Sequence, residues 1–115
     1  MNKTLIIDFD GTITDFKFPE MGEPKEGVRE ALQDLKDAGF EIVILSCRTG
    51  DECSTYLIEK KEQVRAMEAY LKRHNIPYDA VLNKDKPIAM YYIDDRAIEF
   101  KDNWGDIAER FKNDQ

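Results

Sequence analysis

The sequence has few of the residues that build disulfide frameworks and soft-metal sites. Its 115 residues include two cysteines and one histidine. Cys47 and Cys53 fit no metal or redox spacing, so we expect reduced thiols in a cytoplasmic protein. No apolar run approaches the roughly 20 residues that a membrane helix needs. The first apolar stretch, which Asp8 interrupts, is too short for a signal peptide. We therefore expect a cytoplasmic protein with no membrane partner.

Positive charge is also in short supply. The 17 lysine and arginine residues face 24 aspartate and glutamate residues, a formal net charge of −7. A nucleic-acid binder usually has a basic surface, so stable nucleic-acid binding is not expected. The chain is 42% hydrophobic, within the ordinary globular range, and long enough for one core. With no internal repeat and no linker, we predict a single domain over residues 1–115.

Hydrophobic periodicity predicts alternating strands and helices. We expect strands at residues 5–7, 40–46, 79–82 and 89–95, with a short edge strand at 97–100, and helices at 24–38, 55–74 and 104–111. Pro24 favours a helix start and Gly39 a helix end. Two strands joined by a helix within about 40 residues form a parallel βαβ unit. The expected fold class is therefore α/β, with a three-layer, Rossmann-like parallel sheet flanked by helices.

Polar side chains follow the predicted strands at the point where each one ends. They are Asp8 and Asp10 after the first strand, Ser46 and Arg48 after the second, Lys84 or Lys86 after the third, and Asp94 and Asp95 after the last. The carboxyl ends of parallel strands lie at one edge of a sheet, where ligands bind. We therefore expect these residues to converge, although each alone also fits an ordinary turn.

The convergence predicts phosphate chemistry. Several carboxylates at one edge require a cation, and oxygen ligands favour Mg²⁺ over zinc. Nearby lysine, serine and arginine side chains can donate to phosphate oxygens. An aspartate can attack phosphorus, and a second carboxylate two residues later can protonate the leaving oxygen and then deprotonate water.

The ordered segments LIIDFDGT, IVILS, a lysine and YYIDD resemble the four motifs of the haloacid dehalogenase-like (HAD) phosphatase superfamily. They span residues 5 to 95. The resemblance implies that Asp8 is the nucleophile and Asp10 the general acid/base. It also implies that Ser46 binds the transferring phosphoryl group. Lys86, in preference to Lys84, would hold the nucleophile and the phosphate.

The resemblance also implies a cofactor and substrate contacts. Mg²⁺ would be held by the acids after the first and last strands, Asp8, Asp10, Asp94 and Asp95. The substrate contacts would come from Gly11, Thr12 and Arg48, the last by analogy with an arginine of nucleotide-directed members.

The short segments between the motifs leave no space for a cap domain. A capless site suits nucleotides, polynucleotides or other large phosphorylated substrates, or a lid from a second subunit of a homo-oligomer. Residues 13–24 form a loop or flap in which Phe16 and Phe18 either cover the site or pack at the domain edge. We expect a Mg²⁺-dependent phosphomonoester hydrolase. The alternatives are a phosphoacceptor signalling domain and a catalytically idle Mg²⁺-binding scaffold.

Overall fold

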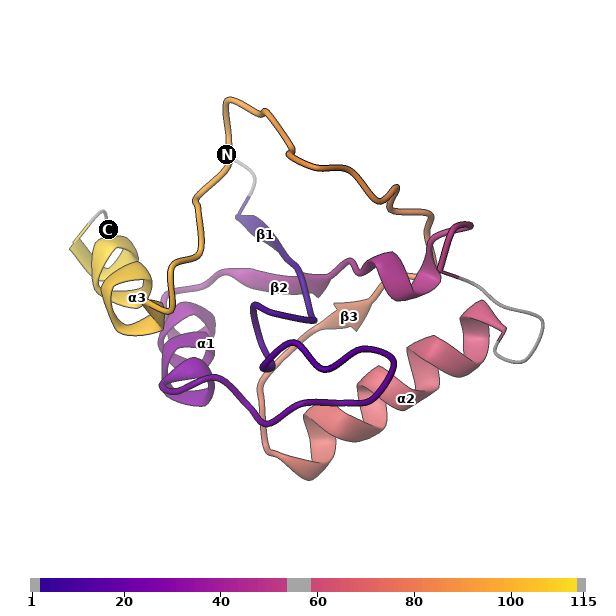
Figure 1. Cartoon of the computed structure of the whole chain (residues 1–115). Coiled ribbons are helices and arrows are strands. Elements are labelled where there is room, and N and C mark those ends of the chain that lie inside the picture. Colours follow the sequence, from indigo (N-terminus) through magenta and orange to yellow (C-terminus); the bar gives the residue numbers. More distant parts are fainter. Residues whose placement is uncertain (1–2, 54–58, 114–115) are drawn as a thin grey trace.

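The computed structural model describes residues 3–53 and 59–113, which form one parallel sheet flanked by helices (Figure 1). The strands are β1 (Thr4–Ile7), β2 (Glu41–Ile44) and β3 (Ala80–Val81), in the order β1-β2-β3. The helices are α1 (Val28–Asp37), α2 (Lys60–Arg73) and α3 (Trp104–Asn113), with a short 3₁₀ helix η1 (Cys47–Thr49). In the ladder, Ile7 lies opposite Ile44, and Ile44 opposite Val81. The predicted α/β class with a parallel sheet is confirmed.

Helix α1 forms because its apolar residues share one face. Val28, Ala31, Leu32 and Leu35 are all buried against the sheet. The helix starts four residues later than predicted, after Gly27 in the left-handed region (φ 79°). It ends as predicted before a glycine, residue 39, whose φ of 93° favours glycine.

Helix α2 packs its inner face onto the residues that follow β1. Met67, Tyr70 and Leu71 are buried, and the Tyr70 ring meets Phe9 edge-to-face at a centroid distance of 5.4 Å. The sequence predicts this helix from residue 55, and residues 55–58 lie outside the described residues. Phe9 is fully buried between two partly exposed aspartates.

Helix α3 closes the other end of the core. It packs beside α1, with Trp104, Ile107 and Ala108 buried (Figure 1). The indole Nε1 of Trp104 donates to the carbonyl of Thr12 at 2.8 Å. Trp104 is therefore a core residue, and it fixes α3 to the turn after β1.

The strand predicted at residues 89–95 is not formed. Residues 82–103 run as an arch from β3 to α3 (Figure 1), and Met90 and Ile93 are 90% and 99% exposed. Lys86 holds the start of the arch to Asp8, and α3 fixes its end. The arch therefore contributes no strand to the sheet. Residues 97–100 form no strand either. Within the described part of the chain, no helix is long and apolar enough to cross a membrane.

Candidate functional site

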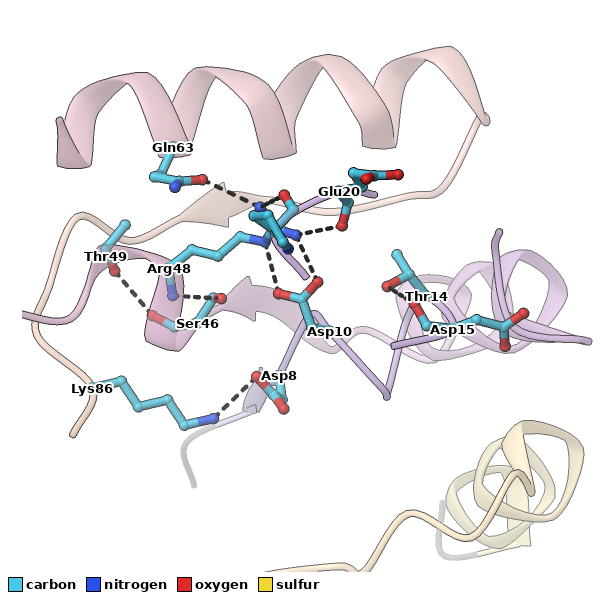
Figure 2. Close-up of polar contacts among 11 residues, drawn as sticks. Asp8, Asp10, Thr14, Asp15, Glu20, Ser46, Arg48, Thr49, Gln63 and Lys86 are labelled. Atoms are coloured by element: carbon cyan, nitrogen blue, oxygen red, sulfur yellow. Dashed lines mark hydrogen bonds and ion pairs between the residues drawn. The ribbon is translucent and has the colours of Figure 1, made fainter. Parts of the chain in front are cut away.

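Asp8 and Lys86 meet at the carboxyl edge of the sheet, where Ser46 also lies. Asp8 directly follows β1 and Ser46 lies two residues after β2. The Nζ atom of Lys86 lies 3.2 Å from Oδ1 of Asp8, whose side chain is 39% exposed (Figure 2). An accessible carboxylate with a cation beside it can meet a phosphorylated ligand from solvent.

The loop that carries Lys86 is held by the turn after β2. The Thr49 hydroxyl donates to the Lys84 carbonyl at 2.6 Å. The backbone N–H of Asp51 donates to the Asp85 carboxylate at 2.8 Å. Lys84 is exposed and its backbone carbonyl is bound by Thr49, whereas Lys86 is the lysine that reaches the acid.

Tyr92 is a neighbour of the site that sequence reasoning missed. Its ring centroid lies 5.2 Å from Nζ of Lys86, and its hydroxyl donates to the Pro87 carbonyl. Partial burial and a contact with Cys47 raise the pKa of Tyr92 to about 12. The only sequence signal was an aromatic residue in an apolar run, which indicates core packing rather than contact with a lysine.

Asp10 is held in a buried ion pair with Arg48. Nε and Nη2 of Arg48 donate to Oδ2 and Oδ1 of Asp10 at 2.7 and 2.8 Å (Figure 2). The two side chains are 3% and 11% exposed. This two-point contact uses the planar fork of the guanidinium, which lysine lacks.

Arg48 is not placed to bind a substrate phosphate, the role predicted for it. Its Nη1 donates to the Pro19 carbonyl at 3.1 Å and to Gln63 at 3.4 Å, and its Nη2 donates to the Glu20 carbonyl at 2.8 Å. Together with the two bonds to Asp10, these contacts use all five N–H groups of a guanidinium.

The flap of residues 13–24 lies against this arginine. The Phe18 ring centroid is 4.9 Å from Cζ of Arg48, whereas Phe16 is exposed to solvent. The buried hydroxyl of Tyr70 donates to the Gly22 carbonyl at 2.7 Å. Phe18 therefore lies beside the Arg48 side chain, and neither phenylalanine is shown to cover Asp8.

The remaining predicted contacts have local roles in this structure. Ser46 is buried, and its hydroxyl oxygen accepts the N–H of Arg48 at 3.0 Å, which caps η1. The N–H of Gly11 donates to the Thr14 carbonyl and the N–H of Thr12 to the Phe9 carbonyl. The backbone amides of Gly11 and Thr12 are therefore used within the turn.

Asp94 and Asp95 do not join the other acids. Both are exposed on the arch, and Asp94 accepts the N–H of Arg96 at 2.8 Å. Within the described ranges, no three histidine, cysteine or acidic residues lie close enough to hold a metal ion. Both oxygens of Asp10 already face Arg48. In this arrangement the acids do not form the Mg²⁺ site that the sequence predicted.

Two solved structures share this architecture. An MCSG target from Vibrio cholerae is 29% identical over 98% of this chain and 99% of its own, with a TM-score of 0.68. A conserved protein from Bacteroides thetaiotaomicron is 24% identical over 100% of this chain and 93% of its own, with a TM-score of 0.62. No family model and no curated protein matches the chain. The likeness extends over the whole chain and supports the small α/β fold.

Proposed function

We propose that this protein is a phosphomonoester hydrolase of the HAD-like kind that forms an aspartyl-phosphate on Asp8. The observation that carries the proposal is the ion pair between Asp8 and Lys86 at the carboxyl edge of the sheet, with Asp8 open to solvent. The order of the sequence motifs adds support. Asp8 follows the first strand, as a nucleophile in such a fold should.

The chemistry assigned to Asp8 has two steps. A carboxylate oxygen of Asp8 bonds to phosphorus while the bond from phosphorus to the ester oxygen breaks, and that oxygen takes a proton. Water then attacks the aspartyl-phosphate, which releases inorganic phosphate and restores Asp8. Lys86 would offset the charge of the phosphoryl oxygens, and Ser46 would bind one of them. Asp10 would exchange the protons in both steps.

Magnesium dependence is a separate part of the proposal. When bound, Mg²⁺ would neutralise charge on the phosphoryl oxygens. Asp94 or Asp95 would have to leave its exposed position on the arch before it could share an ion with Asp8. No step above is assigned to the ion.

The openness of Asp8 bears on the substrate class. Its side chain is 39% exposed, and the nearby flap is tied to Arg48 rather than folded over Asp8. An open carboxylate at a sheet edge suits a phosphate on a large molecule, such as a nucleotide or a polynucleotide end. A screen of phosphorylated metabolites, nucleotides and phosphorylated oligonucleotides would identify the class.

The test is hydrolysis of p-nitrophenyl phosphate by wild type and Asp8→Asn. We expect the variant to fall to the background rate with an unchanged thermal midpoint, because the amide keeps the shape but cannot attack phosphorus. Asp106→Asn, at an exposed residue of α3, is the matched control and should keep full activity. Full activity in Asp8→Asn would refute the assignment of the nucleophile.

The metal part is tested with the same assay after EDTA treatment. We expect activity to be lost with EDTA and restored by Mg²⁺. Undiminished hydrolysis in EDTA would reject the metal and leave the nucleophile in place. A chain that binds Mg²⁺ but releases no phosphate from any substrate would instead be the idle scaffold.

A further inference from the structure

Arg48 is charged, buried and linked to an acid of the site, yet the proposed reaction gives it no role. We propose that Arg48 is a positioning residue that holds the Asp10 carboxylate in place and fastens the flap, residues 13–24, beside it. This inference rests on the proposed function, because it assigns Arg48 to the proton-transfer residue of that reaction.

The geometry at Asp10 supports positioning rather than simple charge balance. Two nearly parallel bonds of 2.7 and 2.8 Å fix both oxygens of the carboxylate (Figure 2). A single bond would let the side chain rotate, whereas the fork leaves it one orientation. Each carboxylate oxygen can accept more than one hydrogen bond, so Asp10 can still exchange a proton with a substrate while Arg48 holds it.

The same guanidinium also joins three parts of the chain. Besides Asp10 after β1, it donates to the Glu20 carbonyl of the flap and to Gln63 of α2 (Figure 2). It also donates to the Pro19 carbonyl of the flap. The Phe18 ring lies beside it. Because one planar group makes all of these contacts, the flap and the Asp10 carboxylate are fixed relative to each other.

The backbone of Arg48 contributes to this placement. Its N–H donates to the Ser46 hydroxyl at 3.0 Å, so η1 orients the arginine from the end of β2. Ser46, predicted to bind the phosphoryl group, and Arg48, which holds Asp10, are thus both fixed by the η1 turn. A shift at Arg48 would move the Asp10 carboxylate relative to Asp8, and displacements of about 1 Å can lower rates 100-fold.

The experiment compares wild type, Arg48→Lys and Asp10→Asn on two substrates, p-nitrophenyl phosphate and phenyl phosphate. The nitrophenolate leaves without help, whereas the phenolate needs a proton. If Arg48 positions Asp10, Arg48→Lys should lower kcat/KM, which reports phosphoryl transfer to Asp8, at least ~10-fold for phenyl phosphate and much less for the nitrophenyl ester. Asp10→Asn should show the same substrate pattern. The double variant should lose no more than Asp10→Asn alone.

Other kinetic outcomes overturn the proposal. An equal loss on both substrates with a raised KM, together with weaker inhibition by inorganic phosphate, would make Arg48 a substrate ligand. If the activity losses of Arg48→Lys and Asp10→Asn add in the double variant, Arg48 does not act through Asp10. Arg65→Lys, at an exposed arginine of α2, is the control for arginine replacement.

A second measurement is independent of activity. Backbone amide exchange in residues 15–22 should be faster in Arg48→Lys than in wild type and unchanged in Arg65→Lys. A wild type inactive on every phosphate ester, with faster flap exchange in Arg48→Lys, would reject the proposed function and keep the flap contact. Unchanged exchange in Arg48→Lys would reject the fastening of the flap.

Discussion

Tyr70 connects α2 to the flap, and its removal gives the sharpest test of this structure. The side chain is 2% exposed, its hydroxyl donates to the Gly22 carbonyl at 2.7 Å, and its ring contacts Phe9. Tyr70→Phe keeps the ring and deletes the hydrogen bond, which leaves a carbonyl without that donor. We expect a loss of about 1–2 kcal/mol in the free energy of unfolding at pH 7.

The pH dependence of this loss follows from the tyrosine itself. Burial raises the pKa of Tyr70 to about 12, whereas in the unfolded chain it is about 10. Below pH 10 both states keep the proton. Between pH 10 and 12 the unfolded state releases it and the folded state does not, so the free energy of unfolding falls as pH rises. By pH 11 the wild type should have lost about 1 kcal/mol in this way.

Phenylalanine cannot titrate, so the two proteins should converge at high pH. The stability gap should shrink from about 1–2 kcal/mol at pH 7 toward zero at pH 11. Urea unfolding followed by the fluorescence of Trp104, the single tryptophan, measures the gap. Tyr91→Phe, at a side chain that is 78% exposed, controls for loss of a hydroxyl at pH 7. A gap that stays constant from pH 7 to 11 would refute the burial of the Tyr70 hydroxyl.

Three further predictions concern the turn after β2, helix α3 and the contact between Lys36 and Asp79. A Cβ on Gly50 would lie 2.6 Å from the Lys86 carbonyl, so Gly50→Ala should displace Lys86 and lower both kcat and the thermal midpoint. Unchanged kcat in Gly50→Ala would contradict the placement of Lys86. Gly105 lies in α3, and a Cβ there would meet no atom within 4 Å, so Gly105→Ala should raise the free energy of unfolding by about 0.5–1 kcal/mol. The hydrogen bond from Lys36 lowers the pKa of Asp79. The charged Asp79 therefore stabilises the folded state above about pH 4, and this contribution is lost as pH falls further. The urea midpoint of Asp79→Asn should therefore lie below that of wild type at pH 6 and approach it at pH 3, and a gap that widens in acid would contradict the ion pair.

The parts of the fold that sequence predicted are those set by local pattern. The apolar run before Asp8 and the one before Ser46 became neighbouring parallel strands, because each is continuous and ends at polar residues. The stripe on α1 placed its core face correctly. The second and third predicted strands are longer than β2 and β3, because apolar character extends past the residues that find ladder partners, whereas β1 and α3 extend beyond their predicted bounds.

The contacts that sequence could not predict join distant segments. Arg48 and Asp10 are 38 residues apart, and Tyr70 and Gly22 are 48 apart. No periodicity identifies which carboxylate an arginine will meet, and an arginine after a strand fits a ligand role equally well. The observed pair depends on how α2 and the flap pack around η1, which only the folded chain determines.

Residues 89–95 account for the largest difference between the predicted and the observed fold. They also account for the largest difference between the predicted and the observed site. Their apolar run predicts a buried strand, and the two acids after it were expected at the carboxyl edge for that reason alone. In the structure the run is exposed, while β1 lies at an edge of the sheet with Ile6 63% exposed. In the structure this segment lies outside the sheet, and Asp94 and Asp95 are exposed on the arch. We predict that Mg²⁺ binding between Asp94 and Asp8 would require residues 90–93 to pack against the sheet, so Mg²⁺ affinity and amide protection in this segment should rise together or not at all.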